Sequence, residues 1–75
     1  MGAGVNLDDV RGVVAVAELG QVGAAADELG ISQSALTRRV QRMERALGAS
    51  LFNRVGRRLV LNTRGAVSYT HLTLP

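Results

Sequence analysis

The 75-residue chain has no cysteine, one histidine and two aromatic residues, and each scarcity excludes a class of protein. Without cysteine there is no disulfide framework, and one histidine cannot supply the ligands of a structural zinc site. The chain also lacks a Cys nucleophile, a metal-ligand cluster, a phosphate-binding glycine loop and a histidine near its acidic residues. We therefore expect no enzyme activity and no cofactor.

Long apolar runs are absent as well. No segment approaches the roughly 20 apolar residues of a membrane span, and the N-terminal residues lack the basic stretch of a secretory signal. We expect a cytoplasmic protein with no membrane partner. With only Phe52 and Tyr69 as aromatics, a core in a chain of this length must consist of aliphatic residues and forms one small domain.

What the chain does have is a division of charge. Residues 1–37 hold one arginine against five acidic residues, a balance of −4, whereas residues 38–64 hold eight arginines against one glutamate, a balance of +7. A basic half suits a polyanion, because each cation set against a phosphate releases counterions. Every basic residue is arginine, which genomic base composition explains more readily than bidentate recognition of phosphate and guanine.

The apolar spacing predicts three helices with recognisable ends. Asn6 can cap the first helix, Asp8 and Asp9 suit its opening turn, and Gly20 ends it. A short helix over residues 22–29 ends at Gly30, and Ser32 caps a third helix of about residues 33–47 that Gly48 closes. The expected inward residues are Leu7, Val10, Val13, Val14 and Ala17 on the first helix, Val22, Ala25, Ala26 and Leu29 on the second, and Leu36, Val40, Met43 and Leu47 on the third.

A short helix, a glycine stop and a longer helix are the layout of a helix-turn-helix, whose second helix enters the DNA major groove. The outward side of the third helix carries Gln33, Ser34, Thr37, Arg38 and Gln41. An ordinary amphipathic helix with a solvated basic face would look the same on charge alone. The short helix directly before it favours DNA recognition.

Two short apolar runs follow, residues 51–55 and 59–61, around a turn with Gly56. This pattern predicts a hairpin, a wing of about residues 52–61, with Phe52 as its core anchor. Arg57 and Arg58 are expected at its tip and Arg54 on its approach, where they can meet the DNA backbone or minor groove. Asn62 can cap a fourth helix that starts near Thr63 and barely begins.

These residues resemble a known family. The matching runs are Ala25-Ala26-x-x-Leu29-x-Ile31-Ser32-Gln33-Ser34-Ala35-Leu36-Thr37-Arg38 and Met43-Glu44-x-x-Leu47-Gly48-x-x-Leu51-Phe52-x-Arg54. Together they closely resemble LysR-type transcriptional regulators over about residues 7–65. The resemblance implies a mainly α winged helix-turn-helix, three helices plus a short two-stranded wing, that binds double-stranded DNA sequence-specifically to regulate bacterial transcription.

Carried over by position, the resemblance implies DNA contacts from recognition helix and wing. The expected residues are Ser32, Gln33, Ser34, Thr37, Arg38, Arg54 and Arg57. Gln33 suits adenine, and Arg38 suits guanine or a phosphate. Weaker candidates, expected to face solvent or act at long range, are Arg39, Arg42, Arg45 and Arg58.

The chain departs from the family at Val13, Gln21 and Val22, where Phe, Ser and Phe are common. A smaller core is expected there. The family also implies a linker helix that makes a homodimer and a domain that binds a small co-inducer, both expected to lie outside this chain. Residues 67–75 resemble a translated transposon sequencing adapter, and their Ser, Thr and Pro disfavour a long helix. We therefore expect the DNA-binding domain, with the start of the linker helix, to occupy residues 1–66, and 67–75 to be a non-native tail.

A rival interpretation is a small helical protein-interaction or antitoxin-like module. Such a module would also use an amphipathic helix but would not need arginine at a wing tip. A steep salt dependence of duplex binding separates the two, because only a DNA binder releases counterions on binding.

Overall fold

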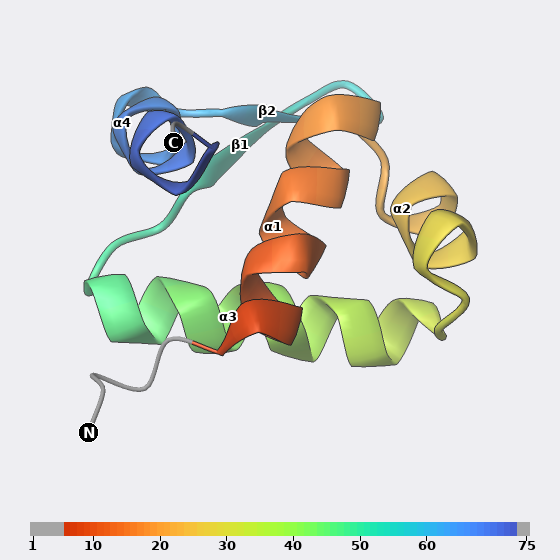
Figure 1. Ribbon diagram of the computed structural model, residues 1–75. Helices are drawn as coiled ribbons and strands as arrows, with labels where there is room; N and C mark the ends of the chain where they lie inside the picture. The colour runs from red at the N-terminus through yellow and green to blue at the C-terminus, as the bar shows by residue number, and fades with distance from the viewer. Residues whose placement is uncertain (1–5, 74–75) are drawn as a thin grey trace.

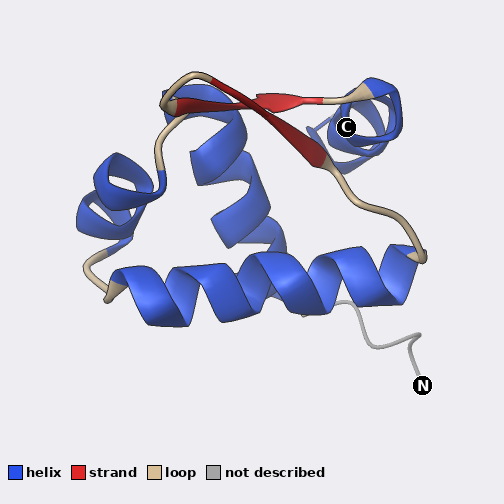
Figure 2. Ribbon diagram, turned by 180° about the vertical axis from the view of Figure 1, so that it is seen from behind, coloured by secondary structure: helices blue, strands red, loops and turns tan. Residues whose placement is uncertain are grey.

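Helix α1 (Leu7–Leu19) stands across the middle of α3 (Gln33–Leu47) and organises the fold (Figure 1). The computed structural model describes the backbone of residues 6–73 and the side chains of residues 6–71. Helix α2 (Val22–Leu29) packs beside α1, and strands β1 (Phe52–Val55) and β2 (Arg58–Leu61) pass over the C-terminal end of α1. Helix α4 (Thr63–Thr73) follows the hairpin (Figure 2). This arrangement confirms the expected winged helix-turn-helix.

Side chains cap the helices where the sequence predicts. The Asn6 side-chain oxygen accepts a hydrogen bond from the Asp8 N–H at 2.7 Å, and Ser32 Oγ accepts one from the Ala35 N–H at 3.1 Å. These bonds satisfy backbone donors that a helix N-terminus leaves unpaired. Helix α2 begins at Gln21 without a side-chain cap, so its start depends on its packing against α1 and α3.

The core is aliphatic and lies between the first three helices and the wing. Its fully buried side chains are Val13, Ala15, Val16, Ala25, Ala26, Leu36, Met43 and Leu51. The prediction for α2 is confirmed, because Val22 and Leu29 also pack against this core. On α3 the prediction is confirmed at Leu36, Val40 and Met43, whereas Leu47 at the end of the helix is 40% exposed.

The predicted inner stripe of α1 is wrong at its start. Leu7 is 64% exposed, while Asp9 is only 2% exposed. Successive helical residues are 100° apart, so Leu7 and Asp9 lie on nearly opposite sides of α1. The observed stripe runs through Asp9, Val13 and Val16, at spacings of four and three, because this side of α1 faces α3.

The wing is an antiparallel pair in which Phe52 opposes Leu61 and Arg54 opposes Leu59. Cross-strand partners point to the same face, so Arg54 shares the core-facing side with Phe52 and Leu59. A turn of Gly56 and Arg57 joins the strands, and Gly56 has a φ of 62°. The predicted hairpin is confirmed, but Arg58 belongs to β2 rather than to the turn.

Helix α4 begins as predicted and extends farther than predicted. Asn62 Oδ1 accepts a hydrogen bond from the Gly65 N–H at 2.8 Å, which caps the helix. The expectation that residues 67–75 would not continue the helix is wrong through Thr73, and Pro75 lies outside the described residues. Two polar side chains of this part of α4 form hydrogen bonds: Thr70 Oγ1 donates to the Ala66 carbonyl at 2.9 Å, and the Tyr69 hydroxyl donates to the Glu18 carboxylate at 3.2 Å. Tertiary packing on α1 thus outweighs weak helix propensity. Within the described residues, no helix is long and apolar enough to cross a membrane.

Candidate nucleic-acid interface

The turn between α2 and α3 fixes the position of the recognition helix. Gly30 has a φ of 69°, and its N–H donates to the Ala26 and Asp27 carbonyls. The Ile31 N–H donates to the Ala26 carbonyl at 3.0 Å. A positive φ is easily adopted only by glycine, so Gly30 allows the chain to reverse within two residues. Ser32 then caps α3 at once.

Helix α3 presents a polar face away from the core. Leu36 and Met43 are buried at one side, and the opposite side carries the exposed residues Ser34, Thr37, Arg38, Gln41 and Arg45. Because this face has no charge partner within hydrogen-bond distance in the described part of the chain, its side chains are available to a ligand. Its shape and polarity suit the base edges and phosphates of a major groove.

A groove joins α3 to the start of α2 and to the wing. Its lining residues are Gln21, Val22, Gly23, Gln33, Arg54, Arg57 and Leu59. A second depression beside it is lined by Thr37, Gln41 and Arg54, among others. Arg54 lines both, since it lies on the inward face of β1. The fold therefore brings together Gln33, Thr37, Arg54 and Arg57 from separate parts of the sequence.

Glycine at position 23 leaves room for Gln33 in this groove. A methyl group at Gly23 would lie 3.2 Å from Gln33 Nε2. The Gln33 amide therefore rests against the backbone of α2, where it can present one donor and one acceptor to a base.

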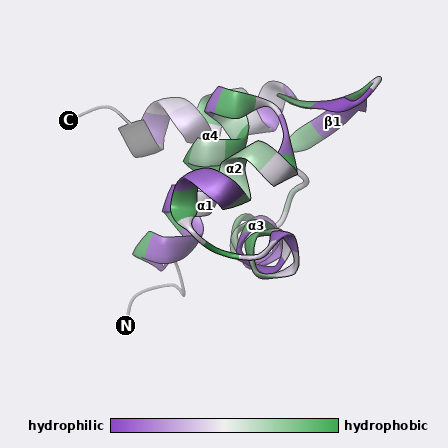
Figure 3. Cartoon of the chain, turned by 90° about the vertical axis from the view of Figure 1, so that its right-hand side faces the viewer, coloured by the Kyte–Doolittle hydropathy of each residue, from purple (hydrophilic) through white to green (hydrophobic). Residues whose placement is uncertain are grey.

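The remaining predicted residues lie on the adjoining surface of α3. Ser34 and Arg38 are exposed, one helical turn apart, outside the groove residues. Ser32 is exposed at the N-terminus of α3, and its hydroxyl still has a proton to donate while its oxygen caps the helix. Figure 3 shows the hairpin projecting from the body of the domain. A duplex against α3 would thus also meet the wing.

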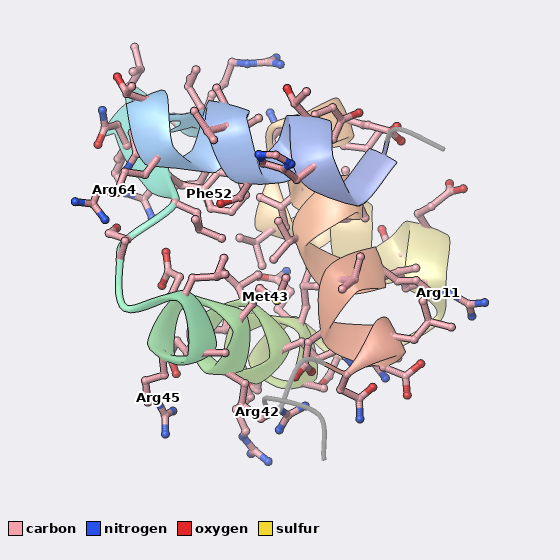
Figure 4. The ribbon with its side chains drawn as sticks, turned by 60° about the vertical axis from the view of Figure 1, so that its left-hand side comes forward. Arg11, Arg42, Met43, Arg45, Phe52 and Arg64 are labelled. Atoms are coloured by element: carbon pink, nitrogen blue, oxygen red, sulfur yellow. The ribbon has the colours of Figure 1, made fainter. Side chains whose placement is uncertain are left out.

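Of the four arginines expected to face solvent, Arg42, Arg45 and Arg58 are exposed, and Figure 4 shows Arg42 and Arg45 extending from the surface of α3. Arg39 is half-buried, and a methyl group at Gly12 would lie 3.2 Å from its Cβ. The Arg58 guanidinium rests against Gly20 at the C-terminus of α1, where the helix dipole favours a cation. Here the Leu59 N–H also donates to the Gly20 carbonyl at 2.8 Å, which ties the wing to α1.

Arg42 pairs with the buried carboxylate of Asp9. Its Nη2 donates to Oδ1 at 2.9 Å, and its Nε lies 3.2 Å from both carboxylate oxygens. This hydrogen bond, together with the negative charge of Asp9, raises the pKa of Arg42 above its usual value. The sequence did carry a signal for the burial of Asp9, since Asp9 falls on the same helical stripe as Val13 and Val16.

Comparison with known proteins shows to which family the chain belongs. Residues 7–66 match the model for bacterial regulatory helix-turn-helix proteins of the lysR family. The chain is 50% identical over 63 residues to the HTH-type transcriptional regulator TfdT of Cupriavidus pinatubonensis, covering 84% of the chain and 28% of TfdT. It is 46% identical over 56 residues to ClcR of Pseudomonas putida, covering 75% and 19%. The curated relatives are much longer, and the chain spans between 14% and 28% of their length.

Solved structures agree with this match. The CbnR DBD in a DNA complex superposes with a TM-score of 0.83 at 33% identity, over 89% of this chain and 77% of that one. The BenM DBD in complex with benA site 1 DNA gives 0.83 at 34% identity, over 89% and 75%. In both cases the compared protein is in complex with DNA.

Proposed function

Because the chain belongs to the LysR family of bacterial regulatory helix-turn-helix proteins, we propose that it binds duplex DNA with α3 in the major groove and the wing on the backbone or minor groove. Sequence-specific DNA binding in transcription regulation is the function that the family supports, together with the DNA complexes of the CbnR and BenM domains. The observation that carries the proposal is the groove in which Gln33 of α3 meets Arg54 and Arg57 of the wing.

Each residue has a role that suits its chemistry. The Gln33 amide pairs with adenine, and Arg38 pairs with guanine or a phosphate, where a good bidentate pair contributes about 1–3 kcal/mol of discrimination. Thr37 contacts a base edge. Ser32 and Ser34 of the recognition helix contact phosphates. Arg54 and Arg57 of the wing contact phosphates or the minor groove, and together these contacts set the register of the protein on the duplex.

The family decides against the rival interpretation of a protein-interaction or antitoxin-like module. The relatives are transcriptional regulators rather than enzymes, and we propose no catalytic role for this chain. A regulator that reads bacterial DNA works in the cytoplasm, and we place the full-length protein there.

We propose that the full-length protein is a homodimer joined through a linker helix that starts in α4, with a separate domain for a small co-inducer. Two-fold dimers of helix-turn-helix proteins bind half-sites about 34–36 Å apart. A single domain makes half of these contacts, so we expect the 75-residue chain to bind a full operator weakly.

We also propose that the DNA-binding domain, with the start of the linker helix, occupies residues 1–66. Residues 67–75 are then a non-native tail translated from a sequencing adapter. This proposal comes from the resemblance of the tail to adapter sequence. Long reads across the source locus test it. Reads that reproduce the codons for 67–75 in the native locus would refute it.

Replacing Arg38 by Ala tests the DNA-binding surface. We expect affinity for a duplex selected from a randomised library to fall by roughly 1–3 kcal/mol, with helix content unchanged. Arg11→Ala is the matched control, because Arg11 is an exposed arginine of α1 that lies with Glu18 and Glu28, away from the groove (Figure 4). Equal affinity of the Arg38 variant and the unaltered chain would remove Arg38 from the interface.

A further inference from the structure

The pair formed by Asp9 and Arg42 joins α1 to the recognition helix. Asp9 is the one charged side chain that is fully buried among the described residues. Its carboxylate lies against the Nε and Nη2 groups of Arg42, at 2.9–3.2 Å. A fork-shaped contact of this kind holds the plane of a guanidinium in one orientation.

A guanidinium so held still has an unused edge. Arginine has five N–H donors, and Asp9 engages only the edge that carries Nε. The side chain of Arg42 remains 52% exposed, so the edge formed by Nη1 and Nη2 can reach solvent or a ligand. Figure 4 shows Arg42 and Arg45 extending from α3 on the side away from Met43, which points into the core.

On α3, Arg42 lies across the exposed face of the helix from Gln33 and Thr37. It follows Arg38 by four residues and precedes Arg45 by three, so these three arginines form one row on the helix. The row spans roughly 10 Å along the helix axis, at 1.5 Å per residue. Seen from the core, this row lies on the flank of α3 opposite to the Gln33 and Thr37 flank, which lines the depressions shared with Arg54 of the wing. A helix in a major groove has a phosphate strand along each flank.

We propose that Arg42 contacts a DNA phosphate and that Asp9 is its positioning residue. The inference rests on the proposed function, since it adds a contact to the same DNA interface. The Asp9–Arg42 ion pair carries almost no net charge, so the proposed gain in DNA affinity does not come from added positive charge. Asp9 instead fixes the long side chain in advance, so that less conformational entropy is lost when a phosphate binds the free edge.

Four proteins test this proposal: the unaltered chain, Asp9→Asn, Arg42→Gln and the double variant. Affinity for one selected duplex is measured by fluorescence anisotropy at a temperature where circular dichroism shows each to be folded. We expect Asp9→Asn to weaken binding several-fold while Arg42 is present, and to cause no weakening in the Arg42→Gln background. A role of the ion pair in fold stability alone would leave the affinity of folded Asp9→Asn unchanged. Unchanged or tighter binding of Asp9→Asn with Arg42 present would therefore overturn the proposal.

Arg42→Gln leaves a buried carboxylate unpaired, which destabilises a fold strongly, whereas replacing both partners is often neutral. The double variant therefore serves as a folded reference without the ion pair. Arg42→Lys adds a second test, because lysine keeps the charge and can pair with Asp9 but has no second edge. We expect Arg42→Lys to stay folded and to bind several-fold more weakly. Affinity equal to that of the unaltered chain would refute the phosphate contact.

Arg38→Ala distinguishes a failure of the Arg42 contact from a failure of the proposed DNA-binding function. If it weakens binding while Arg42→Lys and Asp9→Asn do not, only the Arg42 contact fails. If the unaltered chain shows no salt-dependent binding to duplex DNA, the proposed function fails as well.

Discussion

Gly65 is the position where a single methyl group should cost the fold most for its size. It is buried in the first turn of α4, and a Cβ there would fall far inside van der Waals contact with the Leu51 carbonyl oxygen. The same Cβ would lie 2.8 Å from Leu61 Cδ2. Neither neighbour can simply swing away: the Leu51 oxygen belongs to the backbone, and Leu51 is fully buried. Gly65→Ala must therefore push α4 away from the hairpin.

The expected magnitude follows from what that displacement breaks. The Leu51 carbonyl accepts the Asn62 N–H at 2.9 Å, so moving α4 strains the bond that connects it to the hairpin. Overpacking costs about 1–3 kcal/mol, and an unmade buried hydrogen bond costs about 1–3 kcal/mol. Higher helix propensity of alanine offsets about 1 kcal/mol. We expect a net loss of roughly 1–5 kcal/mol, and each kcal/mol lowers the Tm of a domain of this size by about 4–8 °C.

Thermal unfolding followed by circular dichroism measures this loss, with Gly23→Ala as the matched control. Gly23 is also a helical glycine near the start of its helix, but its added methyl meets only the Gln33 side-chain amide, at 3.2 Å. That amide can rotate, so we expect the control to keep or slightly raise the Tm. If Gly65→Ala unfolds within a degree or two of the unaltered chain, the close packing of α4 on Leu51 is not a property of the protein in solution.

Three further outcomes follow from named contacts. Ser32→Ala removes the acceptor of the Ala35 N–H and should lower the free energy of unfolding by about 1 kcal/mol, measured in urea. Ser32→Asp should restore the helix cap and the stability. An unchanged urea midpoint for the alanine variant would contradict the cap. Leu36→Ala, at a fully buried position, should cost about 2–5 kcal/mol in the same assay, against little change for the exposed Leu7→Ala. Burial, the hydrogen bond to Glu18 and the charge of Glu18 raise the pKa of Tyr69 above its ordinary value. The stabilisation by neutral Tyr69 is thus fully present below pH 10 and is lost as the pH rises through the pKa of Tyr69 in the folded chain. The absorbance of the phenolate should therefore titrate at a higher pH in the folded chain than in urea. Glu18→Gln should make this difference smaller.

Much of the architecture could be read from local sequence, because its signals are short-range. Gly30 and Ser32 mark the end of one helix and the start of the next through backbone conformation and capping, which need no distant partner. The bounds of α2 and α3 were predicted correctly for this reason. The hairpin was found from two apolar runs around Gly56. Its register was not, since one residue of slip exchanges which side chains face the core.

The candidate site was predictable residue by residue but not as an assembly. Gln33 and Thr37 stand out on the polar face of an amphipathic helix, and Arg54 and Arg57 stand out in the hairpin. Their meeting in one groove depends on β1 placing Arg54 on its inward face.

By itself the sequence determined the ends of the first three helices, the polar face of α3 and the basic character of the second half of the chain, since each arises between residues close together in the chain. Only the tertiary structure decided which arginine has which neighbour. Asp9 reaches Arg42 across 33 residues, and Arg58 reaches Gly20 across 38. Helix α4 likewise continues to Thr73 through contact with α1, against the weak helix propensity of its own residues. Such pairings depend on how the helices pack in three dimensions, and that packing is not encoded in any short stretch of the chain.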